Sequence, residues 1–330
     1  MLKHWLLACT VAMVPSLALA QDAASAAPDT TPAPQATAMD SASAAPMTCA
    51  QAHAAMPPGA RLDVFDPDAP LERRQAALAA FEQAAALEGC PEFDYVLGML
   101  YRHGPYLPGN LLPQDIEKAR ALIAPMAEAG DLQAFADMAE MEMRHANSRE
   151  AMRWTQLYLH FVKTVAMDFA RDPEQVRFMN AAYNSNLLAR TELIWRYTRP
   201  KLSRKLIGED LNAWLKAHPG VAERMRARMT EGEPDAAGGV ATLEQDPGDC
   251  YVTLPTGMGA AAATWLLEVW PSGKVGRVVM ENFVPKPEIA NQMLHCVHEH
   301  RFQPFAGTDP VTVRLPMVVG SSEARPLRRR

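Results

Sequence analysis

The sequence lacks the short motifs by which common enzyme classes are recognised. Its 330 residues contain no phosphate-cradling glycine loop, no Gly-x-Ser-x-Gly, no Ser-x-x-Lys and no His-Glu-x-x-His. Such motifs supply the nucleophiles, metal ligands and phosphate contacts of hydrolases and nucleotide-binding enzymes. We therefore expect a non-enzymatic protein without a cofactor.

An excess of positive charge is also missing. The chain has 32 Lys and Arg against 38 Asp and Glu, a net charge of -6. Nucleic-acid-binding surfaces are basic, so this balance argues against a nucleic-acid partner. The one basic run, in residues 321–330, is expected to be a solvated tail. A hydrophobic content of 48% is enough for more than one packed domain.

No apolar run near the N-terminus reaches the roughly 20 residues that a membrane-spanning helix needs. Residues 5–17 are apolar, Lys3 and His4 precede them, and the small residues 18–20 follow. This order is typical of a cleavable secretion signal, so residues 1–20 predict export to the periplasm. The alternative is an uncleaved segment that anchors the chain in the inner membrane, facing the periplasm. Only in that case would the protein contact a membrane.

Residues 21–47 have little that could build a core. They are mostly Ala, Pro, Ser and Thr, and they contain no aromatic residue. Such a composition buries too little apolar surface to offset the entropy lost on ordering. We expect a flexible linker that ends where the first domain begins.

Residues 48–229 are predicted to be α-helical. Glycines at positions 89 and 130 mark helix ends. The expected helices are residues 71–87, 91–103, 114–128, 175–197, 203–217 and 221–229. Two copies of a helix pair are visible: Gly89 and Gly98 correspond to Gly130 and Ala139, and residues 117–119 correspond to residues 149–151 in a degenerate second copy.

These helix pairs resemble Sel1-like repeats, which are relatives of the tetratricopeptide repeat. The residues that carry the resemblance are Leu97, Gly98, Tyr101, Ala119 and Gly130. The second copy departs from the pattern, because alanine replaces the packing glycine and the loop glycine is absent. The resemblance implies αα-hairpins that stack as a short solenoid and bind other proteins.

A second domain is predicted over residues 250–320, after a linker rich in Gly, Pro, Glu and Asp at 230–249. Strands are expected at 265–270, 275–283 and 311–319, with a hairpin turn at 271–274 and a helix at 286–300 that is followed by residues 301–305. The strand pattern has a period of two, which places Trp265, Leu267 and Val269 on one face. The helix should pack on the sheet with one apolar face, made of Ile289, Met293, Cys296, Val297 and His300.

This module is similar to the C-terminal domain of the TonB family of periplasmic energy transducers. The matching residues are Gly273 and Val278 in the first hairpin and Arg301, Phe302 and Pro304 after the helix. Three family positions differ, where Cys296, His298 and His300 replace alanine, arginine and tryptophan. The resemblance implies a small α+β domain that contacts envelope proteins, with outer-membrane receptors among the candidates. Strand exchange into a homodimer stays open.

Five cysteines are present, and Cys9 would leave with the signal. The remaining four are an even number in an oxidising compartment, which predicts two disulfides. Three pairings are open. We favour Cys49 with Cys90 and Cys250 with Cys296, because each pair then lies within one predicted domain. The alternative, a redox-active cysteine pair, is not supported, because the sequence has no Cys-x-x-Cys spacing.

Only one cluster has the residue types of a metal site, and it lies at residues 295–300. His295, His298 and His300 sit close enough on a helix to offer two ligands on one face. His300 also occupies a core-facing position, whereas His295 and His298 would be solvated. We therefore assign no metal site, and a metal-dependent protein remains a third hypothesis.

Taken together, these patterns favour a multidomain periplasmic protein: a helical Sel1-like domain followed by a small α+β TonB-like domain. Its expected function is protein–protein interaction or scaffolding, with the C-terminal module contacting envelope proteins through a strand edge. The alternative is a TonB-type energy transducer for outer-membrane transport, which requires the N-terminal segment to remain as an anchor.

Overall fold

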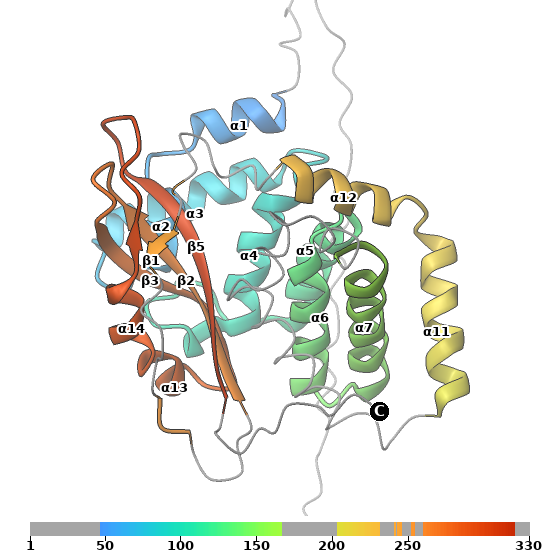
Figure 1. Cartoon of the computed structure of the whole chain (residues 1–330). Helices are drawn as coiled ribbons and strands as arrows, with labels where there is room; N and C mark the ends of the chain where they lie inside the picture. The colour runs from blue at the N-terminus through green and yellow to red at the C-terminus, as the bar shows by residue number, and fades with distance from the viewer. Residues whose placement is uncertain are drawn as a thin grey trace, which may run out of the picture. The chain divides into compact units, whose positions relative to one another are not determined.

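The computed structural model describes residues 47–166, 203–231, 241, 243–245, 252–254 and 260–320 (Figure 1). All of these belong to the compact unit that begins at Pro46. Within them the chain combines helices with small antiparallel sheets, which agrees with the predicted helical domain and α+β part. The predicted signal, linker 21–46, helix 175–197 and basic tail lie outside the described residues.

The first part of the chain is helical. Its elements are α1 (Cys49–Ala55), α2 (Ala60–Phe65), α3 (Leu71–Ala85), α4 (Pro91–His103), η1 (Gly104–Tyr106), α5 (Ile116–Glu128), α6 (Leu132–Arg144), α7 (Ser148–Phe161), η2 (Val162–Ala166), α11 (Arg204–Ala217) and α12 (Val221–Glu231). The helices expected at 71–87, 91–103, 114–128, 203–217 and 221–229 are confirmed to within two residues at either end. The short helices α1 and α2 were not predicted.

Helix starts follow from side chains that accept the unpaired first N–H groups. The Asp115 carboxylate accepts from the Lys118 amide at 3.0 Å, and the Asp131 carboxylate accepts from the Ala134 amide at 2.8 Å. Between these helices Gly130 takes φ +91°, which ends α5 and lets α12 approach closely. A Cβ at this position would lie 2.5 Å from the Met225 amide nitrogen, so glycine is required there.

Two helix pairs, α4 with α5 and α6 with α7, pack in the same manner. Gly98 of α4 faces α5 so closely that a Cβ would lie 2.6 Å from the Ile123 side chain. Ala139, the equivalent of Gly98 in α6, is fully buried. After α6, Ala146 takes φ +60° in the short connection before α7 begins at Ser148, a left-handed value that is uncommon for a residue with a Cβ.

The second part is a three-stranded antiparallel sheet with the order β3-β2-β5. Its strands are β2 (Ala260–Val269), β3 (Val275–Val284) and β5 (Val311–Gly320). Trp265 pairs with Leu315 and Leu267 pairs with Val313, so the faces predicted from the period of two coincide in register. Two short strands, β1 (Leu243–Gln245) and β4 (Arg301–Phe302), pair with each other. Thus three residues of the predicted linker form a strand, and it pairs with a two-residue strand that was not predicted.

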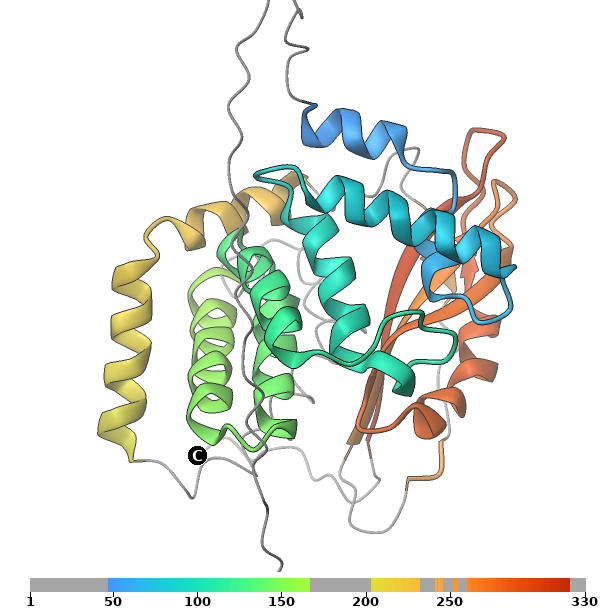
Figure 2. The same ribbon diagram turned by 180° about the vertical axis from the view of Figure 1, so that it is seen from behind.

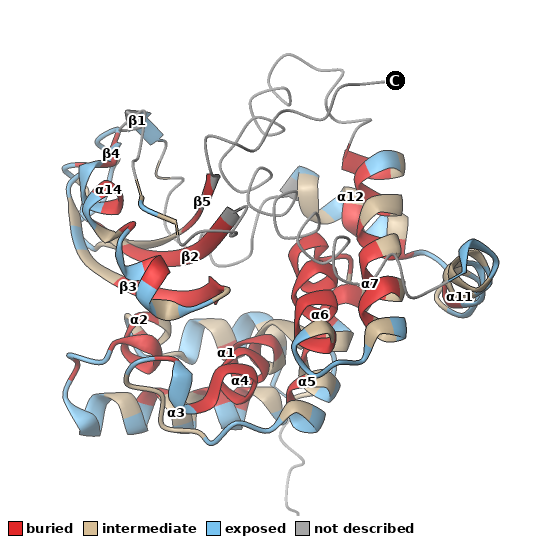
Figure 3. Cartoon of the chain, turned by 90° about the horizontal axis from the view of Figure 1, so that it is seen from below, coloured by how far each residue is buried: buried red, intermediate tan, exposed pale blue. Residues whose placement is uncertain are grey.

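Both faces of the sheet are covered (Figures 1 and 2). The helices α13 (Pro287–Asn291) and α14 (Leu294–Glu299) lie on one side, and α2 and α4 lie on the other. The central strand is accordingly buried, and Leu266 has no exposed surface (Figure 3). Burial on both faces explains why apolar residues such as Leu266 also lie on the face opposite Trp265 and Leu267.

The single helix predicted at 286–300 is broken into α13 and α14 at Gln292 and Met293. The interpretation of its face is nevertheless confirmed, because Met293, Cys296 and Val297 are almost completely buried. The break lets two short segments follow the twisted sheet while each keeps its apolar residues on it.

The predicted disulfide between Cys49 and Cys90 is present, with Cα atoms 5.5 Å apart. It ties α1 to the start of α4. Cys296 is also disulfide-bonded, and Cys250, the partner predicted for it, lies outside the described residues.

Replacing Cys49 and Cys90 together by serine should lower the free energy of unfolding by about 4 kcal/mol. The bond closes a loop over a sequence separation of 41 residues and so reduces the conformational entropy of the unfolded chain. Urea unfolding followed by circular dichroism measures this change, with Met47→Ser as an exposed control. A loss below about 1 kcal/mol would mean that the bond restrains the unfolded chain far less than loop closure requires.

Candidate binding site at the edge of the sheet

The outer edge of β5 is the first element of the candidate site. In the part of the chain that the structure describes, β5 pairs with β2 along ten consecutive positions and with no other strand. In its second half Leu315, Pro316, Met317 and Val319 are buried, whereas residues 311–314 are partly exposed. A half-exposed strand with one unpaired side can accept a further strand.

Pro316 indicates which backbone groups face outward. Proline has no N–H to donate, so it is accommodated in an edge strand where its nitrogen faces away from the neighbour. In an antiparallel pair this orientation alternates along the strand, and the β2–β5 register is unbroken. The N–H groups of Arg314 and Thr312 therefore point outward as well, while that of Val313 points to β2.

A pocket of about 200 Å³ adjoins the start of β5. Thr312 is its only lining residue from the sheet. The remaining lining residues come from the first four helices and the turn between α1 and α2: His53, Met56, Pro57, Gly59, Ala60, Arg61, Phe81, Glu92, Phe93 and Val96. The deepest of these, Phe81, Phe93 and Val96, are at most 4% exposed, so the floor of the pocket is apolar.

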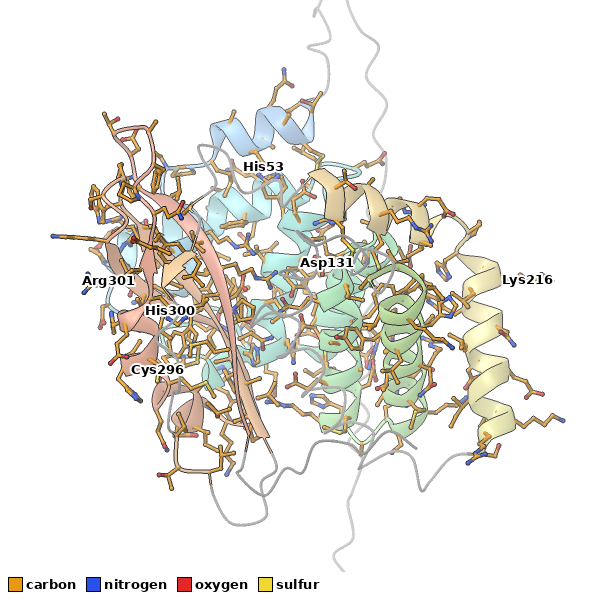
Figure 4. All side chains as sticks on the ribbon, in the orientation of Figure 1. His53, Asp131, Lys216, Cys296, His300 and Arg301 are labelled. Carbon is orange, nitrogen blue, oxygen red and sulfur yellow. A yellow bond between two sulfur atoms is a disulfide. The ribbon has the colours of Figure 1, made fainter. Side chains whose placement is uncertain are left out.

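Charged side chains form the rim of this pocket. His53 lies on the side of α1 that faces the other helices (Figure 4), and its Nε2 is 2.9 Å from the Glu92 carboxylate. The His53 ring also packs on Phe93, with centroids 4.4 Å apart. Arg61 donates from Nη2 to Glu281 at 2.8 Å, which joins α2 to β3. The disulfide holds the start of α1, so this short helix is tied to α4 by one covalent link and by the His53–Glu92 contact.

Behind the pocket lies a buried polar network that connects helices to the sheet. Its centre is the Asp137 carboxylate of α6. This group accepts hydrogen bonds from the Tyr95 hydroxyl at 2.6 Å, from Arg102 at 2.8 Å and from the Asn282 amide at 3.0 Å. Asn282 belongs to β3, so one carboxylate joins α4, α6 and the sheet.

Two further carboxylates complete this network. Arg102 also pairs with Glu140 at 2.7 Å. Glu281 of β3 pairs with both Arg61 and Arg314, and Arg314 donates to the Tyr95 hydroxyl at 3.1 Å. Each buried charge thus has an oppositely charged partner, which is the condition for keeping charges in a protein interior.

The ionisation states follow from these contacts. Burial disfavours the charged form of Glu281, but the guanidinium groups of Arg314 and Arg61 outweigh it and lower the pKa of this carboxyl. Burial, followed by the nearby Asp137 carboxylate, raises the pKa of Tyr95 well above its usual range. Glu281 is therefore an anion and Tyr95 keeps its proton. Neither residue is accessible as an acid or base for a reaction.

His103 is the neutral member of the network. Burial, followed by the charge of Arg102, lowers its pKa well below the usual value. Its Nε2 lies 2.9 Å from the Asn282 carbonyl oxygen and so donates to it, since that oxygen can only accept. Asn282 is held from both sides, by His103 and by Asp137.

The residues of the TonB-like pattern come together at the β2–β3 hairpin. Gly273 takes φ +79°, and a Cβ there would lie 1.9 Å from the Phe302 carbonyl oxygen. The Phe302 amide donates to the Gly273 carbonyl at 3.2 Å, and the Phe305 amide donates to Pro271 at 3.0 Å. Two segments that are thirty residues apart therefore support each other. Arg301 and Pro304 lie at the exposed surface of this contact, and Val278 lies half-buried in β3.

The residues of the repeat-like pattern have packing roles. Leu97 is buried, Ala119 is fully buried opposite Gly98, and Tyr101 accepts a hydrogen bond from Lys118 at 2.6 Å. Gly130 closes on α12, as described above. None of them lines the pocket.

The three histidines of the predicted cluster differ in their exposure to solvent. His295 and His298 are exposed, whereas His300 is buried with Nδ1 3.0 Å from the Cys296 carbonyl oxygen, and Cys296 is disulfide-bonded (Figure 4). Among the described residues, no three His, Cys, Asp or Glu side chains are arranged to hold a metal ion. The described helices also include none that is long and apolar enough to cross a membrane.

Comparison with known proteins returns no family model, no curated protein and no solved structure that matches this chain. The site must therefore be interpreted from its own geometry.

Sequence reasoning did not identify the pocket or the network. One signal was available, because Tyr95 and Arg102 are seven residues apart and share a helix face. An arginine on an otherwise apolar face indicates a buried partner. The partner itself, Asp137, could not be chosen from several acidic residues in α6 without the fold.

Replacing Asp137 by alanine should lower the free energy of unfolding by about 3–5 kcal/mol, because buried Arg102 would lose one of its two carboxylate partners and the Tyr95 hydroxyl and Asn282 amide would lose their acceptor. Urea unfolding measures the loss. Asp210→Ala is the matched control, since Asp210 pairs with a largely exposed arginine, Arg149, and should change stability far less. Equal losses in the two variants would show that the network does not hold the sheet.

The depressed pKa of His103 predicts a pH effect. Below about pH 6.5 the unfolded chain binds a proton at this histidine that the folded chain does not, so stability should fall as pH falls, by at most about 1.4 kcal/mol per pH unit. His103→Gln keeps a donor for Asn282 and should flatten the slope between about pH 6.5 and 5. His298→Gln, which removes an exposed imidazole, should retain the wild-type slope. An unchanged slope in His103→Gln would show that His103 is protonated in the fold.

Proposed function

We propose that this chain is a non-enzymatic interaction protein of the periplasm, and that it contacts envelope proteins by adding an extended segment of the partner to β5. The observation that carries the proposal is the strand itself: ten residues long and, among the described strands, paired only with β2. Backbone hydrogen bonds to an open edge give affinity without requiring a catalytic residue.

The coverage of the sheet supports the choice of β5. Helices occupy both faces, so a partner would meet an edge. The β3 edge is less suitable, because α2, α13 and α14 contact this strand and Arg144 donates to the Pro285 carbonyl at 2.8 Å beside its end. Residues 311–314 of β5 are partly exposed.

The helix pairs α4–α5 and α6–α7 have a place in the proposal as well. Their resemblance to Sel1-like repeats favours a second partner on the helical part. The side of α4 and α6 that faces the sheet is already used by Asp137 and its donors, so this partner would contact the opposite side. The resemblance to the TonB C-terminal domain supports a location in the envelope, with outer-membrane receptors as candidate partners of β5.

A photo-crosslinker at Val311 should form adducts with proteins of the native envelope, whereas one at Lys216, exposed on α11 (Figure 4), should not form the same adducts. Thr312→Pro removes an outward N–H and should reduce the adducts about tenfold. Thr312→Val keeps the N–H and should retain them.

Two results would contradict the proposal. Adducts that survive Thr312→Pro would show that no strand is added at this edge. Identical adducts from Val311 and Lys216 would show that the contact is not specific to β5.

A further inference from the structure

Thr312 belongs to two features at once. Its N–H lies on the outward side of β5, as inferred from Pro316 and the unbroken register. Its side chain lines the pocket formed with the first four helices. The strand edge and the pocket are therefore adjacent at one residue.

Sheet geometry determines what an added strand would place there. Residues that are directly opposite on neighbouring strands have side chains on the same face, with Cβ atoms about 4.5–5.5 Å apart. A residue opposite Thr312 would thus direct its side chain to the helical face of the sheet, beside Thr312. The pocket lies on that face, because Thr312 lines it together with Arg61 and Val96.

We propose that this pocket holds one large apolar side chain, such as Leu, Met or Phe, of the partner segment that pairs with β5. The inference rests on the proposed function, since it requires strand addition. It also specifies that function, because it makes the residue opposite Thr312 the position at which partners are selected.

The lining of the pocket supports an apolar occupant. Phe81, Phe93 and Val96 form a floor that is at most 4% exposed. The polar groups of the rim already have partners: His53 contacts Glu92 at 2.9 Å, and Arg61 pairs with Glu281 of β3 at 2.8 Å. An apolar side chain would cover the floor without disturbing either pair, whereas a charged one would lose water and compete with them.

The size of the pocket agrees with one side chain. Its volume of about 200 Å³ is below the roughly 300–1,000 Å³ of sites that enclose drug-sized ligands or cofactors. The position of the pocket beside a strand edge explains why a partner could fill it with part of an extended segment. Specific pockets for alternate side chains accompany strand addition in general.

The test uses the full chain and a displayed library of random ten-residue peptides. Peptides that bind should share a large apolar residue at one position, and alanine at that position should weaken binding about tenfold to a hundredfold in fluorescence anisotropy. Thr312→Trp fills the pocket from the sheet and should abolish the preference for that residue, while Thr312→Val should keep it. Melting temperatures confirm that each variant is folded.

Phe81→Ala provides a second test, because it enlarges the floor. If this variant folds, the preferred residue should shift to a larger one, such as from Leu to Trp. If it does not fold, the Thr312→Trp result decides alone.

The outcomes separate the two proposals. In one outcome, Thr312→Pro abolishes binding, whereas Thr312→Trp and alanine in the peptide do not change it. This result would overturn the pocket proposal and would leave strand addition supported. Binding that is unaffected by Thr312→Pro would overturn strand addition, and the pocket proposal with it. Failure to select any peptide would overturn both.

Discussion

The position of the sheet depends on one buried carboxylate, that of Asp137. It accepts hydrogen bonds from Tyr95 and Arg102 on the neighbouring helix and from Asn282 on β3. Because a buried charge is tolerated only with its partners in place, the two halves of the chain cannot separate without leaving charges unpaired. The helical part and the sheet therefore form one unit, although their sequence patterns suggest two independent domains. This arrangement covers one face of the sheet, and among the described strands β5 pairs only with β2.

Buried ion pairs of this kind contribute more to position than to net stability. An apolar contact of similar area would exclude water equally well, but it would allow the sheet to slide on the helices. Here Glu281 is held between Arg61 and Arg314, and Asn282 between Asp137 and His103. These contacts fix the register in which Thr312 meets the pocket. Specificity at the edge, as we propose it, is a consequence of that fixed register.

The sequence pattern correctly predicted the elements whose formation depends on residues close together in the chain. The alternation in Trp265, Leu267 and Val269 gave the correct faces, and glycines such as Gly273 lay at turns that need positive φ. Other features depend on distant residues. The helices α1 and α2 are short and stabilised by tertiary contacts, the 286–300 helix breaks to follow a sheet, and β1 forms only because β4 lies beside it. The candidate site joins Thr312 to residues more than two hundred positions earlier, and no spacing in the sequence encodes that contact. The family resemblances are still untested, since no known protein matches the chain.

The central claim is that β5 offers an open edge at its start. Amide hydrogen exchange of the isolated protein, resolved to single residues by NMR, tests it most directly. The account predicts strong protection of Val313, whose N–H points to β2, and fast exchange at Thr312 beside it. The same strong protection at both amides would contradict the account, because the edge would then already be paired.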